Sequence, residues 1–215
     1  MQQVLDAGLF AHYVPGDMEK IATRGRPREF DVDDALTAAL RVFWTKGYEG
    51  ASLTDLTEAM GITRPSLYAA FGNKEALFKH ALDLYEREKL AYVGKALGAP
   101  TARGVVQNLL EGAVGTITSE CKGCMGVIAS ASCGASDSSI KEDVTQRAQS
   151  SRQAIVDRMQ QAIRDGDFPV PTEAEAIAGY IIAVMQGMSV QAGQGASRDE
   201  LMQVVQATLT LWPSR

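Results

Sequence analysis

Residues 64–71 (RPSLYAAF) combine side chains that can recognise a DNA duplex with small ones that permit close approach to it. Arg64 can hydrogen-bond to a guanine edge, and Pro65 and Ala69 can contact thymine methyl groups. The Tyr68 hydroxyl can reach a phosphate at the groove wall, as can the ammonium group of Lys74 just beyond this segment. If residues 64–71 form a helix, one of its sides therefore suits insertion into a major groove.

A helical wheel for this segment separates an inner from an outer side. Leu67, Ala70 and Phe71 fall together and would face a small core. The opposite side and its flanks carry the candidate DNA contacts, which are Arg64, Pro65, Ser66, Tyr68 and Ala69. We expect Phe71 and Leu77 to be core residues without a contact role.

The neighbouring residues predict the layout that would present this helix. Ser52 and Thr63 are N-caps of two short helices as well as candidate DNA contacts, and Gly61 supplies the tight turn between them. Pro65 is tolerated in the first turn because early helix N–H groups have no intrahelical partner. Asn73 caps a longer helix whose dipole adds positive charge at the groove wall. This order of elements is a helix-turn-helix.

A further helix and a basic arm precede this unit. Apolar residues recur over residues 32–43 in the rhythm of one buried helix face, with Asp31 as N-cap and Gly47 as the end. The run from Lys20 to Arg28 lacks acidic residues and holds the remaining candidate DNA contacts, Arg24, Arg26 and Arg28. We predict a flexible extension with this basic arm over residues 1–27, in which Met18 could be the original start.

The overall composition is that of a globular protein without bulk basicity. Of 215 residues, 46% are hydrophobic and 22% charged, and the net charge is −5. Any DNA contact must therefore come from a local patch. The chain shows neither a cationic signal-peptide start nor a stretch approaching the ~20 apolar residues of a membrane span, and three cysteines do not make a disulfide scaffold. We expect a cytoplasmic protein with no membrane partner.

Residues 28–88 resemble the N-terminal domain of TetR-family (tetracycline-repressor-like) regulators. The matching motifs are Gly47-Tyr48, Ser52-Leu53-x-Asp55-Leu56, Met60-Gly61-Ile62-Thr63, Leu67-Tyr68, Phe71 and Asn73-Lys74-Glu75-Ala76-Leu77. By position, Tyr68 and Lys74 match phosphate contacts of the family. The resemblance implies an all-α homodimer that represses from a palindromic operator in double-stranded DNA until a small molecule binds. Ala70 departs from the family, which often has His or Tyr there, and the basic arm could compensate for that missing contact.

Residues 89–215 are predicted to form a helical ligand-binding and dimerisation domain. Periodicity indicates helices over residues 105–117 and 140–163, the second ending at Asp165-Gly166-Asp167. The capping boxes Thr172-x-x-Glu175 and Ser197-x-x-Glu200 would open the last two helices. We expect a flexible loop at 94–104 and a short helix at 127–133. No strand pattern competes, so the predicted fold class is all-α.

The last two helices are the expected dimer surface, and the middle helices are expected to enclose a pocket. The small residues that would permit close contact between dimer helices are Ala178, Gly179, Ala183 and Gly187. The candidate pocket residues suit an adaptable cavity for a small, mostly apolar effector. They are Tyr92, Leu110, Val114, Met125, Ile128, Met159, Phe168, Tyr180 and Met188. A ligand that moves the far end of the helix after Asn73 would alter the separation of two recognition helices.

The cysteines leave a second sensing mechanism open. Cys121, Cys124 and Cys133 form C-x2-C-x8-C, Lys122 would favour a thiolate, and two cysteines three apart could form a reversible disulfide. Plain, partly buried thiols are the simpler interpretation of the same residues.

Metal binding and enzymatic chemistry are less well supported. A structural zinc site needs four ligands, and only His12 and His80 could join the cysteines, so we expect no metal and no other cofactor. A thiol oxidoreductase built on Cys121 and Cys124 would need a strand-helix setting or a partnering His, and the sequence offers neither. We therefore predict a regulator rather than an enzyme.

Overall fold

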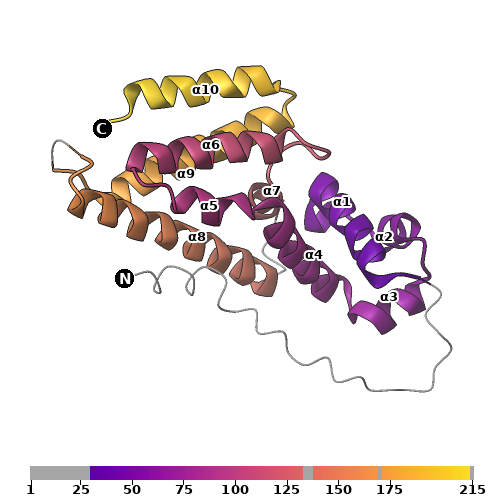
Figure 1. The fold of residues 1–215 in the computed structure, drawn as a ribbon. Helices are drawn as coiled ribbons and strands as arrows, with labels where there is room; N and C mark the ends of the chain where they lie inside the picture. The colour runs from indigo at the N-terminus through magenta and orange to yellow at the C-terminus, as the bar shows by residue number, and fades with distance from the viewer. Residues whose placement is uncertain (1–29, 133–137, 169–170, 214–215) are drawn as a thin grey trace.

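The protein is an all-α molecule, as the periodicity predicted (Figure 1). The computed structural model describes residues 30–132, 138–168 and 171–213, which contain ten helices and no strand. The helices are α1 (Val32–Gly50), α2 (Leu53–Met60), α3 (Arg64–Phe71), α4 (Lys74–Lys89), α5 (Tyr92–Leu97), α6 (Ala102–Ile117), α7 (Met125–Ser132), α8 (Ser138–Arg164), α9 (Ala174–Gly193) and α10 (Arg198–Leu211). Helices α1–α3 gather at one end, and α4 leads from them toward α5 and the remaining helices.

A first hydrophobic core holds α1–α4 together. Aromatic rings meet edge to face at its centre, with centroids 5.0 Å apart for Phe43 and Phe78 and 4.9 Å apart for Trp44 and Tyr85. Leu67 is fully buried in this core, which fixes the inner side of α3 as the helical wheel predicted. The neighbouring Phe71 and Ala70 also face it, the latter only half-buried at the edge.

The predicted caps Asp31, Ser52, Thr63 and Asn73 are all confirmed as N-caps whose side chains accept backbone hydrogen bonds. Gly61 ends α2 in the left-handed conformation, with φ of 64°, where a residue with a Cβ would be strained. Gly47 interrupts α1 with φ of 69° and ψ of 177°, so the regular helix ends there as predicted, although one more turn continues to Gly50.

A second core joins α5, α6, α8, α9 and α10, and α5 corrects a prediction. The loop expected over residues 94–104 is instead helical up to Leu97 and again from Ala102, where α6 begins. Ala96 is buried, and the Tyr92 ring lies so close over Gly112 of α6 that a Cβ there would come within 2.1 Å of it. Six residues are too few for a clear period, and packing rather than propensity stabilises so short a helix.

The starts of α9 and α10 differ in their capping. The Ser197–Glu200 capping box is present. The box predicted at Thr172 is wrong, because α9 begins one residue later, at Ala174, with Glu173 as an N-cap that makes no side-chain capping bond. Glu175 consequently falls at the second rather than the third helical position, too early for the reciprocal bond of a capping box.

Helix α8 links the two cores. Ile140 and Val144 in its first half are buried in the first core, whereas Ile155 and Met159 in its second half are buried in the second. Its 27 residues correspond to about 40 Å of helix. The first core therefore includes side chains from well beyond α4. The predicted domains at 28–88 and 89–215 meet at the end of α4 and remain a prediction.

Helix α9 also corrects an expectation about hydropathy. Its 20 residues contain an 18-residue window with mean hydropathy of 1.3, which by length and composition alone would be enough to cross a membrane, contrary to the sequence interpretation. Core helices of soluble proteins pass the same test. Only 28% of that window is buried within the protomer, so much of an apolar helix faces outward.

Candidate nucleic-acid interface

The outer side of α3 is exposed as the helical wheel predicted. Arg64, Pro65 and Ala69 are exposed, Ser66 is half-buried, and Tyr68 retains 46% of its surface. Helix α3 lies at the edge of the molecule, beside α2 and the start of α4 (Figure 1). The exposed side of α3 thus combines hydrogen-bonding groups with small apolar ones.

Arg64 is held in place by a residue that the sequence did not single out. Beside it, the hydroxyls of Thr63 and Ser66 share a hydrogen bond of 2.9 Å. The Nη2 of Arg64 donates to Oγ1 of Thr54 in α2, also at 2.9 Å. Thr54 is ten residues away in sequence, and only the crossing of α2 and α3 brings the two together. No sequence pattern would have identified it.

The start of α2 carries a second polar cluster. Asp55 accepts hydrogen bonds from the backbone N–H of Ser52 at 3.0 Å and from its hydroxyl at 2.8 Å. Lys46 lies 2.6 Å from the same carboxylate. The bonds from Lys46 and then Ser52 lower the pKa of Asp55 from 3.8 to about 2. Asp55 therefore stays ionised and fixes Ser52 and Lys46 at the exposed N-terminus of α2, where helix N–H groups favour an anion.

Lys74 is positioned by an aromatic ring. Its Nζ lies 4.3 Å from the ring centroid of Tyr48, which is itself buried in the first core. A cation over a ring face is held by the ring quadrupole, so the ammonium group stays near the first turn of α4. The remaining predicted contacts Arg24, Arg26 and Arg28 lie outside the described residues.

Known proteins resemble this chain over almost its full length. Residues 35–81 match the family model "Bacterial regulatory proteins, tetR family". The HTH-type transcriptional repressor ComR of Escherichia coli (strain K12) is 32% identical over 195 residues, which span 89% of this chain and 93% of ComR. The chain belongs to the TetR family. Members of this family are DNA-binding transcriptional regulators, and so is this chain.

Two further relatives agree with this membership. The HTH-type transcriptional repressor BdcR of Escherichia coli (strain K12) is 30% identical over 179 residues, 82% of this chain and 86% of BdcR. A solved structure of the TetR-family regulator CifR, a cysteine mutant complexed with 26-base-pair double-strand operator DNA, has a TM-score of 0.82 and 42% identity. That match covers 88% of this TetR-family chain and all of the CifR chain.

The predicted pocket residues of this TetR-family chain divide between the two cores. Most of them are buried in the second core or packed against it: Tyr92, Leu110, Val114, Met159, Phe168 and Met188. Met125 and Ile128 instead belong to the first core, and Tyr180 is 44% exposed beside Trp212. A surface hollow along α8 is lined by Lys141, Glu142, Thr145, Gln146 and Gln149, none of which was predicted. The effector site remains a prediction.

The cysteine segment lies where the two cores meet. Trp44 of α1 donates its ring N–H to the Gly123 carbonyl at 2.8 Å, and the Tyr85 hydroxyl of α4 donates to Sγ of Cys124 at 3.4 Å. The backbone N–H of Cys124 donates to the Ser189 hydroxyl of α9 at 2.7 Å. Cys121 and Cys124 are free thiols, and Cys133 lies outside the described residues. Over the part of the chain that the structure describes, no three His, Cys, Asp or Glu side chains gather to hold a metal.

Proposed function

We propose that this regulator is a homodimeric repressor that inserts α3 of each copy into successive major grooves of a palindromic operator. The exposed outer side of α3 carries the proposal, because a solvated helix has no need of an exposed tyrosine among small side chains. The similarity to the repressors ComR and BdcR supports it, as does the similarity to CifR, which was solved in complex with operator DNA.

The proposed contacts divide into base reading and phosphate binding. Arg64, with Pro65 and Ala69 beside it, would read base edges, since bidentate arginine suits guanine and small apolar groups suit thymine methyls. Tyr68 and Lys74 would contact phosphates and fix the register without carrying sequence information. The same positioning role suits Ser52, Thr63, Ser66 and the basic arm residues Arg24, Arg26 and Arg28.

The outer sides of α9 and α10 support dimerisation. Five exposed residues of α9 follow the alternating four- and three-residue spacing of a coiled-coil seam: Ala176, Tyr180, Ala183, Gly187 and Val190. No charged residue occurs from Ala176 to Gly193. On α10, the exposed residues beyond its charged first turn are also uncharged: Gln203, Gln206, Ala207, Thr210 and Leu211. Of the small residues predicted at the dimer contact, Ala183 and Gly187 belong to this seam, whereas Ala178 is fully buried within the protomer.

Release by an effector is the remaining part of the proposal. Met159 and Met188 are buried in the second core in this conformation. A small, mostly apolar molecule that inserts between α6, α8 and α9 would separate such side chains. It must bind the DNA-free state more tightly, by a coupling of about 1–3 kcal/mol or more. The chain would act in the cytoplasm without a cofactor, and we propose no enzymatic activity.

Selection of duplexes from a random pool, followed by titration at several salt concentrations, tests the function. We expect a palindromic site whose affinity falls steeply with salt, as counterion release requires. Arg64→Ala should lose sequence preference, whereas Glu142→Gln at an exposed position of α8 should not. A wild-type protein that selects no site and binds all duplexes equally would overturn the proposal. A thermal-shift screen of apolar compounds then tests effector binding.

Thiol sensing is a second candidate because Cys124 lies between Tyr85 of α4 and Ser189 of α9. A bulky or oxidised sulfur would disturb both hydrogen bonds and loosen α4 from α9. We expect an oxidant or alkylating agent to weaken operator binding by the wild type but not by Cys121→Ser/Cys124→Ser. Equal operator affinity before and after complete alkylation would eliminate this candidate.

A further inference from the structure

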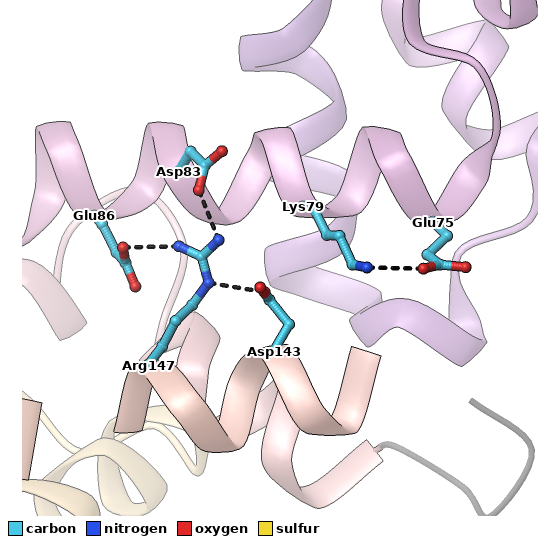
Figure 2. Close-up of polar contacts among 6 residues, drawn as sticks. All are labelled: Glu75, Lys79, Asp83, Glu86, Asp143 and Arg147. Carbon is cyan, nitrogen blue, oxygen red and sulfur yellow. Dashed lines mark hydrogen bonds and ion pairs between the residues drawn. The ribbon is translucent and has the colours of Figure 1, made fainter. Parts of the chain in front are cut away.

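Arg147 of α8 makes three ion pairs at the junction with α4 (Figure 2). Its Nη2 lies 2.7 Å from Asp83 and its Nη1 lies 2.8 Å from Glu86, both on α4. Its Nε lies 2.8 Å from Asp143, one turn earlier on α8. The guanidinium group therefore donates to carboxylates on two helices at once. The Arg147 side chain is only 24% exposed.

The charges around Arg147 do not balance. Three carboxylates share one guanidinium group, and the nearby Lys79 has its own ion pair, 2.8 Å from Glu75. Burial raises the pKa of Glu86, and the charge and hydrogen bond of Arg147 only partly offset this. Without Arg147, three acidic groups would face one another across the junction. Its removal would therefore turn an attractive contact into a repulsive one.

Arg147 lies on α8 between the part of that helix buried in the first core and the part buried in the second. It follows Val144, which is buried in the first core, and precedes Ile155, which is buried in the second. At the other end of the shared surface, the Ser139 hydroxyl donates to Glu75 at 2.5 Å. Helix α4 is thus held along α8 at two points, and its own N-terminus adjoins α3 through Gly72 and Asn73.

We propose that Arg147 is a positioning residue for operator binding, which fixes the tilt of α4 against α8 and thereby the orientation of α3 relative to the body. This rests on the proposed function, since only a dimer bound to two half-sites is sensitive to that orientation. A single half-site would be contacted by α2, α3, Lys74 and the basic arm of one copy only, so its binding does not depend on that orientation. A palindromic operator also requires the two recognition helices to lie one or two helical turns of DNA apart.

Two duplexes separate this role from a merely structural one. We would measure the affinity of Arg147→Met for the selected palindromic operator and for a duplex carrying one half-site. We expect a loss of about tenfold or more on the operator and of less than about twofold on the half-site. Lys141→Met is the matched control, because it removes one positive charge from an exposed position of the same helix. It should leave the operator-to-half-site ratio unchanged.

A mutant cycle tests the ion pairs themselves. Asp83→Asn/Glu86→Gln removes the attraction without creating repulsion, so it should lose less operator affinity than Arg147→Met. Combining all three substitutions removes the repulsion, and the triple variant should match the double one. Circular dichroism and gel filtration show whether Arg147→Met folds. If it does not, the affinities for the operator and the half-site are compared with the double variant instead.

Three results would overturn the proposal. Arg147→Met could bind the operator as Lys141→Met does, it could lose half-site and operator affinity equally, or the triple variant could remain as weak as the single one. A wild type that binds neither duplex specifically would instead overturn the proposed function, and this inference with it.

Discussion

The guanidinium group of Arg64 donates a hydrogen bond of 2.9 Å to the hydroxyl of Thr54 and so ties the first turn of α3 to α2. An exposed arginine would otherwise sample many rotamers. Because the bond selects one of them, less conformational entropy is lost when the side chain meets a base edge.

This relationship predicts different outcomes for Thr54→Val and Thr54→Ser. Valine keeps the shape but removes the acceptor, so we expect operator affinity to fall by about threefold to tenfold, with weaker preference at the base pair that Arg64 reads. Serine keeps the acceptor and should behave like the wild type. Competition binding against operators substituted one base pair at a time checks both variants. Equal base preference in Thr54→Val and the wild type would contradict the prediction.

Tyr68 and Lys74 should affect affinity without affecting sequence preference. Lys74→Met should weaken binding about equally to all operator variants and should reduce the slope of log affinity against log salt by about 1 per protomer. Tyr68→Phe should weaken binding but leave that slope unchanged, since it removes a neutral donor. Titrations between low and moderate salt distinguish the two. A change of preferred sequence in Lys74→Met would show that it reads bases instead.

The basic arm should contribute through charge alone. Deletion of residues 1–28 removes Lys20, Arg24, Arg26 and Arg28, and we expect lower operator affinity with a shallower salt dependence. Replacing these four residues by glutamine should reproduce the deletion. If the glutamine variant binds as the wild type does, the arm makes no phosphate contact.

Asp55 should make stability depend on pH in a defined window. Its pKa is lowered in the folded state, to about 2 from 3.8, so its contribution is fully present above about pH 4 and is lost as the pH falls toward 2. Asp55→Asn should therefore be less stable than the wild type at pH 7, and the difference should shrink below pH 4. Urea unfolding at several pH values measures this, with Glu58→Gln in the same helix as the control. A difference that persists unchanged at pH 2.5 would argue against the ionised carboxylate as its cause.

The seam on α9 predicts the effect of Gly187→Glu. No atom lies within 4 Å of a Cβ at Gly187, so the substitution fits the protomer, and Gly→Ala at this helical site should stabilise it slightly. In a dimer, the glutamate would be buried against its copy. We expect monomers by analytical ultracentrifugation, intact helicity and loss of operator binding. Gln149→Glu on the exposed side of α8 is the control. Dimers of normal affinity in Gly187→Glu would move the interface elsewhere.

Local signals in the sequence determined most of the DNA-binding unit. N-caps at Ser52, Thr63 and Asn73 and the turn at Gly61 depend on hydrogen bonds within three or four residues, so they can be read directly from sequence. The exposed side of α3 follows from helical periodicity in the same way. The box at Thr172 failed because a shift of one residue in the helix start moves its partner out of reach.

Tertiary structure alone decided what joins these elements. Thr54 meets Arg64, Arg147 meets Asp83 and Glu86, and Cys124 meets Tyr85, over separations that no sequence period encodes. Helix α5 forms because Gly112 leaves room for the Tyr92 ring. Periodicity shows which side of a helix is apolar, but not which core receives it. The two halves of α8 therefore look alike in sequence, although the first half packs into the first core with α1–α4 and the second half packs against α6 and α9.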